Sequence, residues 1–73
     1  MTEQQISDLN LAGFFVNKRS NGNYLIEGTT NGIDWIIEED FDAFWVYEYT
    51  GNEYHSIDAF GVLDQALELV RSL

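Results

Sequence analysis

The chain has 73 residues, of which 13 are acidic and three are basic, so its formal net charge at pH 7 is -10. It contains no cysteine, which excludes disulfides, thiolate metal sites and cysteine nucleophiles. Because 45% of its residues are hydrophobic and 15% are aromatic, it is too apolar for a disordered acidic tail, and its length predicts a single domain over residues 1–73.

The apolar and basic residues are distributed in a way that excludes several classes of protein. Apolar runs are only a few residues long, and the first residues have neither a basic nor an apolar signal region, so we expect a cytoplasmic protein with no membrane span. The basic residues are Lys18, Arg19 and Arg71, too few to displace counterions from phosphates. Direct binding to nucleic acid or to an anionic membrane is therefore not expected.

The N-terminal segment has the pattern of a short helix. Thr2 and Gln5 have the spacing of a capping box, and Gly13 is well placed to end the helix. We therefore predict a helix over residues 3–11. A helix of this length is marginal in water, so it must pack against the rest of the chain.

The next segment, residues 14–50, has the pattern of four antiparallel strands. The predicted strands are residues 14–19, 24–29, 33–38 and 44–49. Asn21-Gly22 and Asn31-Gly32 predict tight turns, and residues 39–42 are expected to form the third connection. Links this short favour a meander, because parallel pairing would need long crossovers.

The C-terminal segment predicts a loop at residues 51–55 and then an amphipathic helix over residues 59–72, with Asp58 as its N-cap. The apolar stripe of that helix is Val62, Leu63, Ala66, Leu67, Val70 and Leu73, and the solvent side is Asp64, Gln65, Glu68 and Arg71. The predicted fold class is α+β: a short N-terminal helix, a four-stranded antiparallel meander sheet, and a C-terminal amphipathic helix packed on one face.

Alternation along the strands divides the sheet into two faces of different character. The first face carries Phe14, Val16, Tyr24, Ile26, Ile33, Trp35, Ile37, Phe44 and Val46, and we expect it to meet the C-terminal helix. The second face carries Phe15, Leu25, Glu27, Asp34, Ile36, Glu38, Trp45, Tyr47 and Tyr49. This second set mixes bulky aromatic rings with carboxylates.

Two interpretations of the second face stay open at this point. In the first, the N-terminal helix covers part of it and the aromatic rings only fill cross-strand pairs. In the second, Trp45, Tyr47 and Tyr49, together with Ile36 and Leu25, form a partly exposed binding patch. The register of the fourth strand is also open, since its inversion would exchange Phe44 and Val46 for the aromatic set.

No motif typical of catalysis or metal binding is found. The acidic segment 38–42 lacks the glycine and the spacing of a calcium loop, which leaves a solvated turn or a recognition loop. The single histidine, His55, lies in the predicted loop, and no nucleophile elbow or phosphate-binding glycine loop accompanies it. We therefore predict no enzyme activity and no catalytic, cofactor-binding or metal-binding residue.

The net charge is the strongest functional signal, because it exceeds the magnitude of about 2–8 that solubility calls for in a small domain. An array of carboxylates beside aromatic rings is suited to a basic protein groove, where it would act as a nucleic-acid mimic. We predict a non-enzymatic module that binds a positively charged protein partner. The predicted binding residues are Glu27, Asp34, Glu38, Glu39, Asp40, Asp42, Trp45, Tyr47 and Tyr49.

In size and charge the chain resembles the small acidic α+β inhibitors that phages encode against restriction and CRISPR systems. The resemblance is one of composition and no motif carries it. It implies an inhibitor of a nucleic-acid enzyme. The alternative is a structural or self-associating protein that forms a homodimer through its aromatic sheet face or an edge strand.

Overall fold

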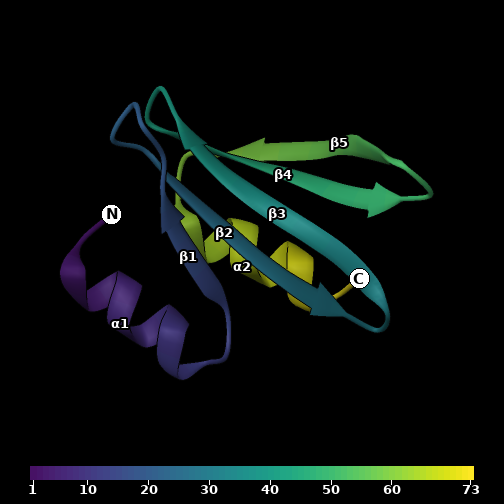
Figure 1. The fold of residues 1–73 in the computed structure, drawn as a ribbon, viewed down its shortest axis with the longest axis horizontal. Coiled ribbons are helices and arrows are strands. Elements are labelled where there is room, and N and C mark those ends of the chain that lie inside the picture. The colour runs from purple at the N-terminus through teal and green to yellow at the C-terminus, as the bar shows by residue number, and fades with distance from the viewer.

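The computed structural model describes residues 1–73 and has an α+β fold with two helices and one antiparallel sheet (Figure 1). The elements are α1 (Glu3–Leu11), β1 (Phe15–Lys18), β2 (Tyr24–Thr30), β3 (Ile33–Asp40), β4 (Ala43–Thr50), β5 (Glu53–Phe60) and α2 (Leu63–Arg71). The strands pair in chain order, β1-β2-β3-β4-β5. The predicted class and the meander are confirmed, but the sheet has five strands, so the predicted number of four is wrong.

Both ends of α1 have the predicted caps. The backbone N–H of Gln5 donates to Thr2 Oγ1 (3.1 Å), and the backbone N–H of Thr2 donates to Gln5 Oε1 (2.8 Å), which forms the capping box. At the other end Gly13 has a φ of +93°, and the N–H of Phe14 donates to the carbonyl of Leu9 (3.0 Å). This is a Schellman ending, which explains why the helix stops where glycine allows the left-handed conformation.

The hydrophobic core lies between the sheet and α2, which crosses behind the sheet in Figure 1. Its buried residues are Leu9, Ile26, Trp35, Ile37, Val46, Leu63, Ala66, Leu67 and Val70. Ile26, Ile37 and Val46 lie side by side across three strands. The predicted apolar face therefore does meet the C-terminal helix. The register of the fourth strand, left open by the sequence, is settled by the structure: Val46 is fully buried and Phe44 packs against the core.

Residues 51–55 do not form the predicted loop. The chain reverses at Gly51-Asn52, with φ of +64° at Gly51, and β5 then pairs along β4. β5 is an edge strand whose residues 53–58 are all exposed, and a β-bulge between Val46 and Tyr47 interrupts its register. An edge strand that buries so little carries a weak alternation of apolar residues, which is why the sequence pattern missed it.

The C-terminal helix is shorter than predicted, at Leu63–Arg71 instead of residues 59–72. Asp58 is not its N-cap, because it lies in β5 opposite Val46 and its Oδ1 accepts from the N–H of Ala59 (2.8 Å). Val62 is the N-cap and is 54% exposed, so its predicted place in the apolar stripe is wrong. The remaining stripe is confirmed: Leu63, Ala66, Leu67 and Val70 are buried, and Leu73 packs against the core.

The third connection is also shorter than predicted. β3 runs on to Asp40, which pairs with Ala43, and only Phe41 and Asp42 form the turn. Both have positive φ, +48° and +60°, the pattern of a type I′ turn. Asn31-Gly32, at +51° and +79°, forms the same turn with the residues that favour it.

Replacing the turn by Phe41→Asn and Asp42→Gly is expected to raise the free energy of unfolding by about 1–2 kcal/mol. The left-handed conformation costs roughly 1–2 kcal/mol for a residue with a Cβ, and Phe41, at 92% exposed, loses no packing. Urea unfolding followed by circular dichroism measures the change. Asp42→Asn, which removes the same charge without glycine, serves as the control. An unchanged unfolding midpoint in the double variant would contradict the expectation.

Candidate functional site

The face of the sheet that points away from α2 is the candidate site, and we call it the outer face. It carries Phe15, Leu25, Glu27, Thr29, Asp34, Ile36, Glu38, Asp40, Trp45, Tyr47, Tyr49 and Tyr54. No helix covers it. Figure 1 shows α1 beside β1, and the buried Leu9 of α1 belongs to the same core cluster as Leu63 and Leu67 of α2. The interpretation in which α1 covers this face is therefore wrong.

The antiparallel register arranges the outer face in rows that cross the strands. The three rows are Leu25–Glu38–Trp45, Phe15–Glu27–Ile36–Tyr47 and Thr29–Asp34–Tyr49–Tyr54. Each row holds one carboxylate directly opposite an aromatic or aliphatic side chain. The strand register therefore places a carboxylate next to an aromatic side chain in each of the three rows.

Seven of the nine predicted binding residues lie together on the outer face. They are Glu27, Asp34, Glu38, Asp40, Trp45, Tyr47 and Tyr49. The aromatic members are open to a partner to different degrees, with Trp45 39% exposed and Tyr47 and Tyr49 half-buried. A partner that contacts Trp45 would also meet the carboxylate opposite it, Glu38.

The other two predicted residues do not join them. Glu39 points to the opposite face, where its Oε2 accepts from the amino terminus of Met1 (2.9 Å) and its Oε1 from the N–H of Tyr24 (3.3 Å). Asp42 lies in the tight turn with φ of +60°, so the extended pair of Asp40 and Asp42 expected from the sequence does not form. The carboxylate of Glu39 thus forms hydrogen bonds within the fold, and that of Asp42 lies at the rim of the acidic surface.

The outer face is short of cations. It carries four carboxylates, Glu27, Asp34, Glu38 and Asp40, and the only cation bonded to them is Arg19, which pairs with Glu38. Four carboxylates and one guanidinium give this face a net charge of -3. No group of three or more His, Asp or Glu side chains is placed to hold a metal ion. The carboxylates therefore present separate hydrogen-bond acceptors.

Tyr54 is an outer-face residue that the sequence analysis missed, because it fell in the predicted loop. It is 56% exposed, and its ring lies 4.8 Å from that of Tyr49, tilted by 50°. The signal that could have found it is Gly51-Asn52, since glycine at the first central position suits a two-residue hairpin turn. Such a turn places Tyr54 opposite Tyr49.

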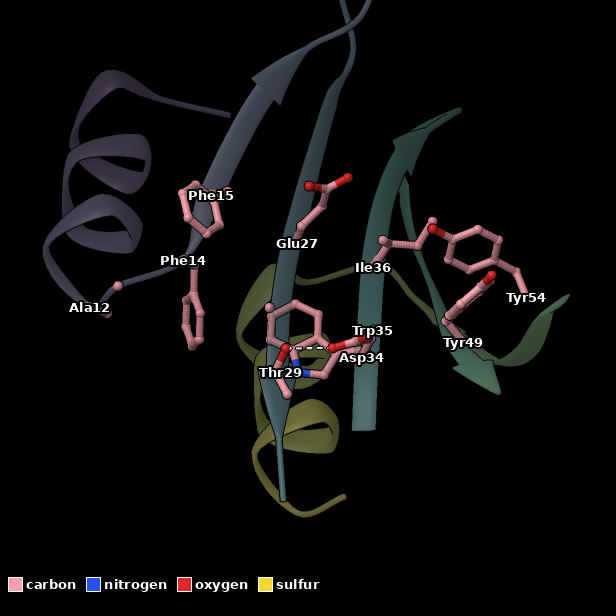
Figure 2. Close-up of a pocket in the computed structure, with 12 residues that line it drawn as sticks. Ala12, Phe14, Phe15, Glu27, Thr29, Asp34, Trp35, Ile36, Tyr49 and Tyr54 are labelled. Atoms are coloured by element: carbon pink, nitrogen blue, oxygen red, sulfur yellow. Dashed lines mark hydrogen bonds between the residues drawn. The ribbon is translucent and has the colours of Figure 1, made fainter. Parts of the chain in front are cut away.

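A hollow of about 630 Å³ opens on the outer face between the α1–β1 corner and the tyrosine pair (Figure 2). Its outer-face lining includes Phe15, Glu27, Asp34, Ile36, Tyr49 and Tyr54. The hollow exists because β1 begins at Phe15, opposite Glu27, so the last residues of β2 have no neighbouring strand on that side. Asp34 Oδ1 accepts from Thr29 Oγ1 (2.6 Å), whereas no hydrogen bond or ion pair reaches the carboxylate of Glu27.

The two helices have nine residues each, and neither is long and apolar enough to cross a membrane.

Comparison with known proteins relates the chain to a phage protein. Residues 1–73 match the model of a family described as a family of unknown function, DUF5495. A relative from Enterobacteria phage T4, an uncharacterized 9.8 kDa protein in the Gp55-nrdG intergenic region, is 42% identical over 67 residues. That alignment covers 92% of this chain and 72% of the relative. No solved structure matches the chain.

Proposed function

The chain belongs to DUF5495, a family of unknown function, and for it we propose a non-enzymatic, cytoplasmic role in which the outer face binds a positively charged partner protein. One observation carries the proposal: the outer face is uncovered and alternates carboxylates with large aromatic side chains. An antiparallel sheet commonly packs one face on the core and presents a polar face to water, so an open face with large aromatic side chains departs from this pattern.

The aromatic residues would supply the contact area. Trp and Tyr are enriched at the centres of protein interfaces, because they bury much surface and lose little side-chain entropy. Trp45 is 39% exposed and lies on β4, where the neighbouring strands β3 and β5 hold its backbone on both sides. An anchor of this kind is pre-organised, so binding does not have to order a loop first.

The carboxylates would steer the partner toward the outer face and accelerate its association. Opposite charge on two surfaces accelerates their encounter and makes binding sensitive to salt. The sharper form of the proposal is that the partner surface is the basic groove of a nucleic-acid-binding protein. Such grooves offer arginine and lysine to phosphates and aromatic rings to bases, so carboxylates beside aromatic rings can occupy them as a mimic. The chain would then inhibit the partner by excluding its nucleic acid.

A second candidate function is self-association, and the free edge of the sheet favours it. β5 is eight residues long, and its first six residues are exposed. Unpaired backbone groups along such an edge can pair with a second copy. Analytical ultracentrifugation distinguishes the candidates: a stable dimer at micromolar concentration that also protects Trp45 from a fluorescence quencher would favour self-association through the outer face.

Binding to the partner is expected to fall at least tenfold, or about 1.4 kcal/mol, in the variant Glu27→Gln, Asp34→Asn, Glu38→Gln. Removal of charges that face a basic surface lowers the association rate and leaves the partner's cations unpaired. The first measurement is the recovery of a basic protein from an enterobacterial lysate on the immobilised chain. The second is the affinity of that purified protein for the original chain and for the variant. We expect the partner to be released in 1 M salt and displaced by DNA.

The matched control is Glu3→Gln, Asp64→Asn, Glu68→Gln. It removes the same charge from exposed positions on the two helices. This variant should bind nearly as well as the original chain, and circular dichroism should show both variants folded. Equal losses in the two variants, or a partner that is acidic and stays bound in 1 M salt, would contradict the proposal.

A further inference from the structure

We propose that the hollow on the outer face is a binding site for the guanidinium group of an arginine side chain. The inference rests on the proposed function and deepens it, because it names the side chain that the partner inserts at the centre of the interface. It is carried by the geometry of the hollow, by the unpaired charges in it, and by the way the chain already binds one of its own arginines.

Two carboxylates from neighbouring strands face the hollow. Glu27 of β2 lies opposite Ile36, and Asp34 of β3 lies opposite Thr29, so the two acids are diagonal neighbours on one face. Residues in that relation are about 7–8 Å apart. A guanidinium has five N–H donors in a planar fork, which allows one group to bond to both carboxylates. Figure 2 shows Glu27 and Asp34 on the same side of the sheet, beside Ile36.

The rest of the hollow provides surfaces for the flat sides of the guanidinium and for the arginine stem. Tyr49 and Tyr54 stand at one side as a ring pair, and Phe15, 70% exposed, stands at the other (Figure 2). A cation is attracted to the face of an aromatic ring, and arginine also stacks on it. Ile36 lies between them on β3, where it can contact the aliphatic part of the side chain.

The chain itself shows that this face binds a guanidinium. Arg19 reaches over from the first hairpin and pairs with Glu38, which lies directly opposite both Leu25 and Trp45. That row therefore has a carboxylate, an aromatic ring, an aliphatic side chain and an arginine. The row of Glu27 has the same first three groups and lacks the cation. The row of Asp34 also lacks the cation, and it combines its carboxylate with two tyrosine rings and Thr29.

The unpaired state of Glu27 gives a physical reason for binding. Its side chain is half-buried, and no donor in the chain reaches its carboxylate. A partly desolvated charge without a partner is unfavourable, and a bound cation relieves it. Lysine fits less well, because an ammonium is a compact, strongly hydrated point charge that lacks the planar fork and does not stack.

The test uses the whole ¹⁵N-labelled chain titrated with N-acetyl-arginine amide, and with N-acetyl-lysine amide as a probe of equal charge. We expect saturable backbone shifts around Glu27, Asp34, Tyr49 and Tyr54, with millimolar affinity and at least fivefold preference for arginine. Glu27→Gln with Asp34→Asn should weaken arginine binding at least tenfold, whereas Asp64→Asn with Glu68→Gln on α2 should leave it unchanged. Tyr54→Ala, which keeps the charge, should weaken it several-fold.

Two results would overturn the site. The first is a set of shifts that never saturates, spreads over all acidic residues and is equal for both probes, which indicates diffuse attraction. The second is saturable binding that Glu27→Gln with Asp34→Asn does not weaken.

The partner measurement separates this inference from the proposed function. If Glu27→Gln with Asp34→Asn still binds the partner while the triple variant that adds Glu38→Gln does not, the proposed arginine site is wrong and the proposed function stands. If the hollow binds arginine but no outer-face variant affects recovery of a basic protein, the site stands and the proposed function fails.

Discussion

Trp35→Ala is expected to lower the free energy of unfolding by about 3–5 kcal/mol, the usual range for removing a large aromatic side chain from a core. Trp35 is only 1% exposed, its ring meets that of Phe14 edge-on at 5.3 Å, and its Nε1 donates to Thr30 Oγ1 (3.0 Å). A chain of this length has about 4–11 kcal/mol of stability in total. The loss is therefore a large share of the total stability, and we expect the variant to unfold at a much lower urea concentration than the original chain.

Urea unfolding followed by far-UV circular dichroism measures this loss. Trp45→Ala is the matched control, because it removes the same side chain from the outer face, where it is 39% exposed. We expect the control to lose less than half as much stability, since less of its surface is removed from water on folding. Equal losses would show that Trp35 is not the centre of the core.

Gly28→Ala is expected to lower the free energy of unfolding by about 1–3 kcal/mol or somewhat more, through overpacking of the core. A Cβ at this position would lie 2.4 Å from Cζ2 and 2.8 Å from Cη2 of Trp35. The indole ring is buried and bonded to Thr30, so it cannot move aside freely. Gly61→Ala is the control, because a Cβ there has no neighbour within 4 Å and the glycine has no positive φ. We expect it to be neutral or slightly stabilising.

A second background tests the cause of the Gly28→Ala effect. Trp35→Phe removes the outer ring atoms that the new Cβ would meet, so Gly28→Ala should cost less than about 1 kcal/mol in that background. The coupling between the two positions is then at least about 1 kcal/mol, as is typical of residues in contact. An equal cost in both backgrounds would mean that the close approach to Trp35 is not the reason for glycine at position 28.

Much of the fold was predictable because its signals are local. The capping box of Thr2 and Gln5 and the ending at Gly13 involve residues that are neighbours in the chain, and α1 has the predicted bounds. Alternation in β2, β3 and β4 also placed Ile26, Ile37 and Val46 on the buried face. These strands have neighbours on both sides and one buried face, the condition under which alternation is clearest.

The errors lie where stability comes from distant partners. β5 forms because its backbone pairs with β4, although residues 53–58 are all exposed and so carry little apolar pattern. Asp58 was wrongly predicted as the N-cap and Val62 as part of the apolar stripe for the same reason. The residues that precede α2 in the sequence belong to β5, so the helix begins only at Leu63. Glu39 was predicted to lie in a connection and to bind the partner, but β3 runs through it and the fold brings the amino terminus of Met1 to its carboxylate.

The sequence by itself determined a net charge of -10, the capped first helix, and one sheet face that mixes carboxylates with aromatic rings. These properties follow from residue types and from spacing along the chain. Only the tertiary structure decided that this face is left uncovered, because Leu9 draws α1 to the core cluster that contains α2. It also decided that Arg19 neutralises Glu38, while Glu27 keeps its charge unpaired beside a hollow. Charge balance at a surface depends on which distant side chains meet, and spacing along the chain does not carry that information.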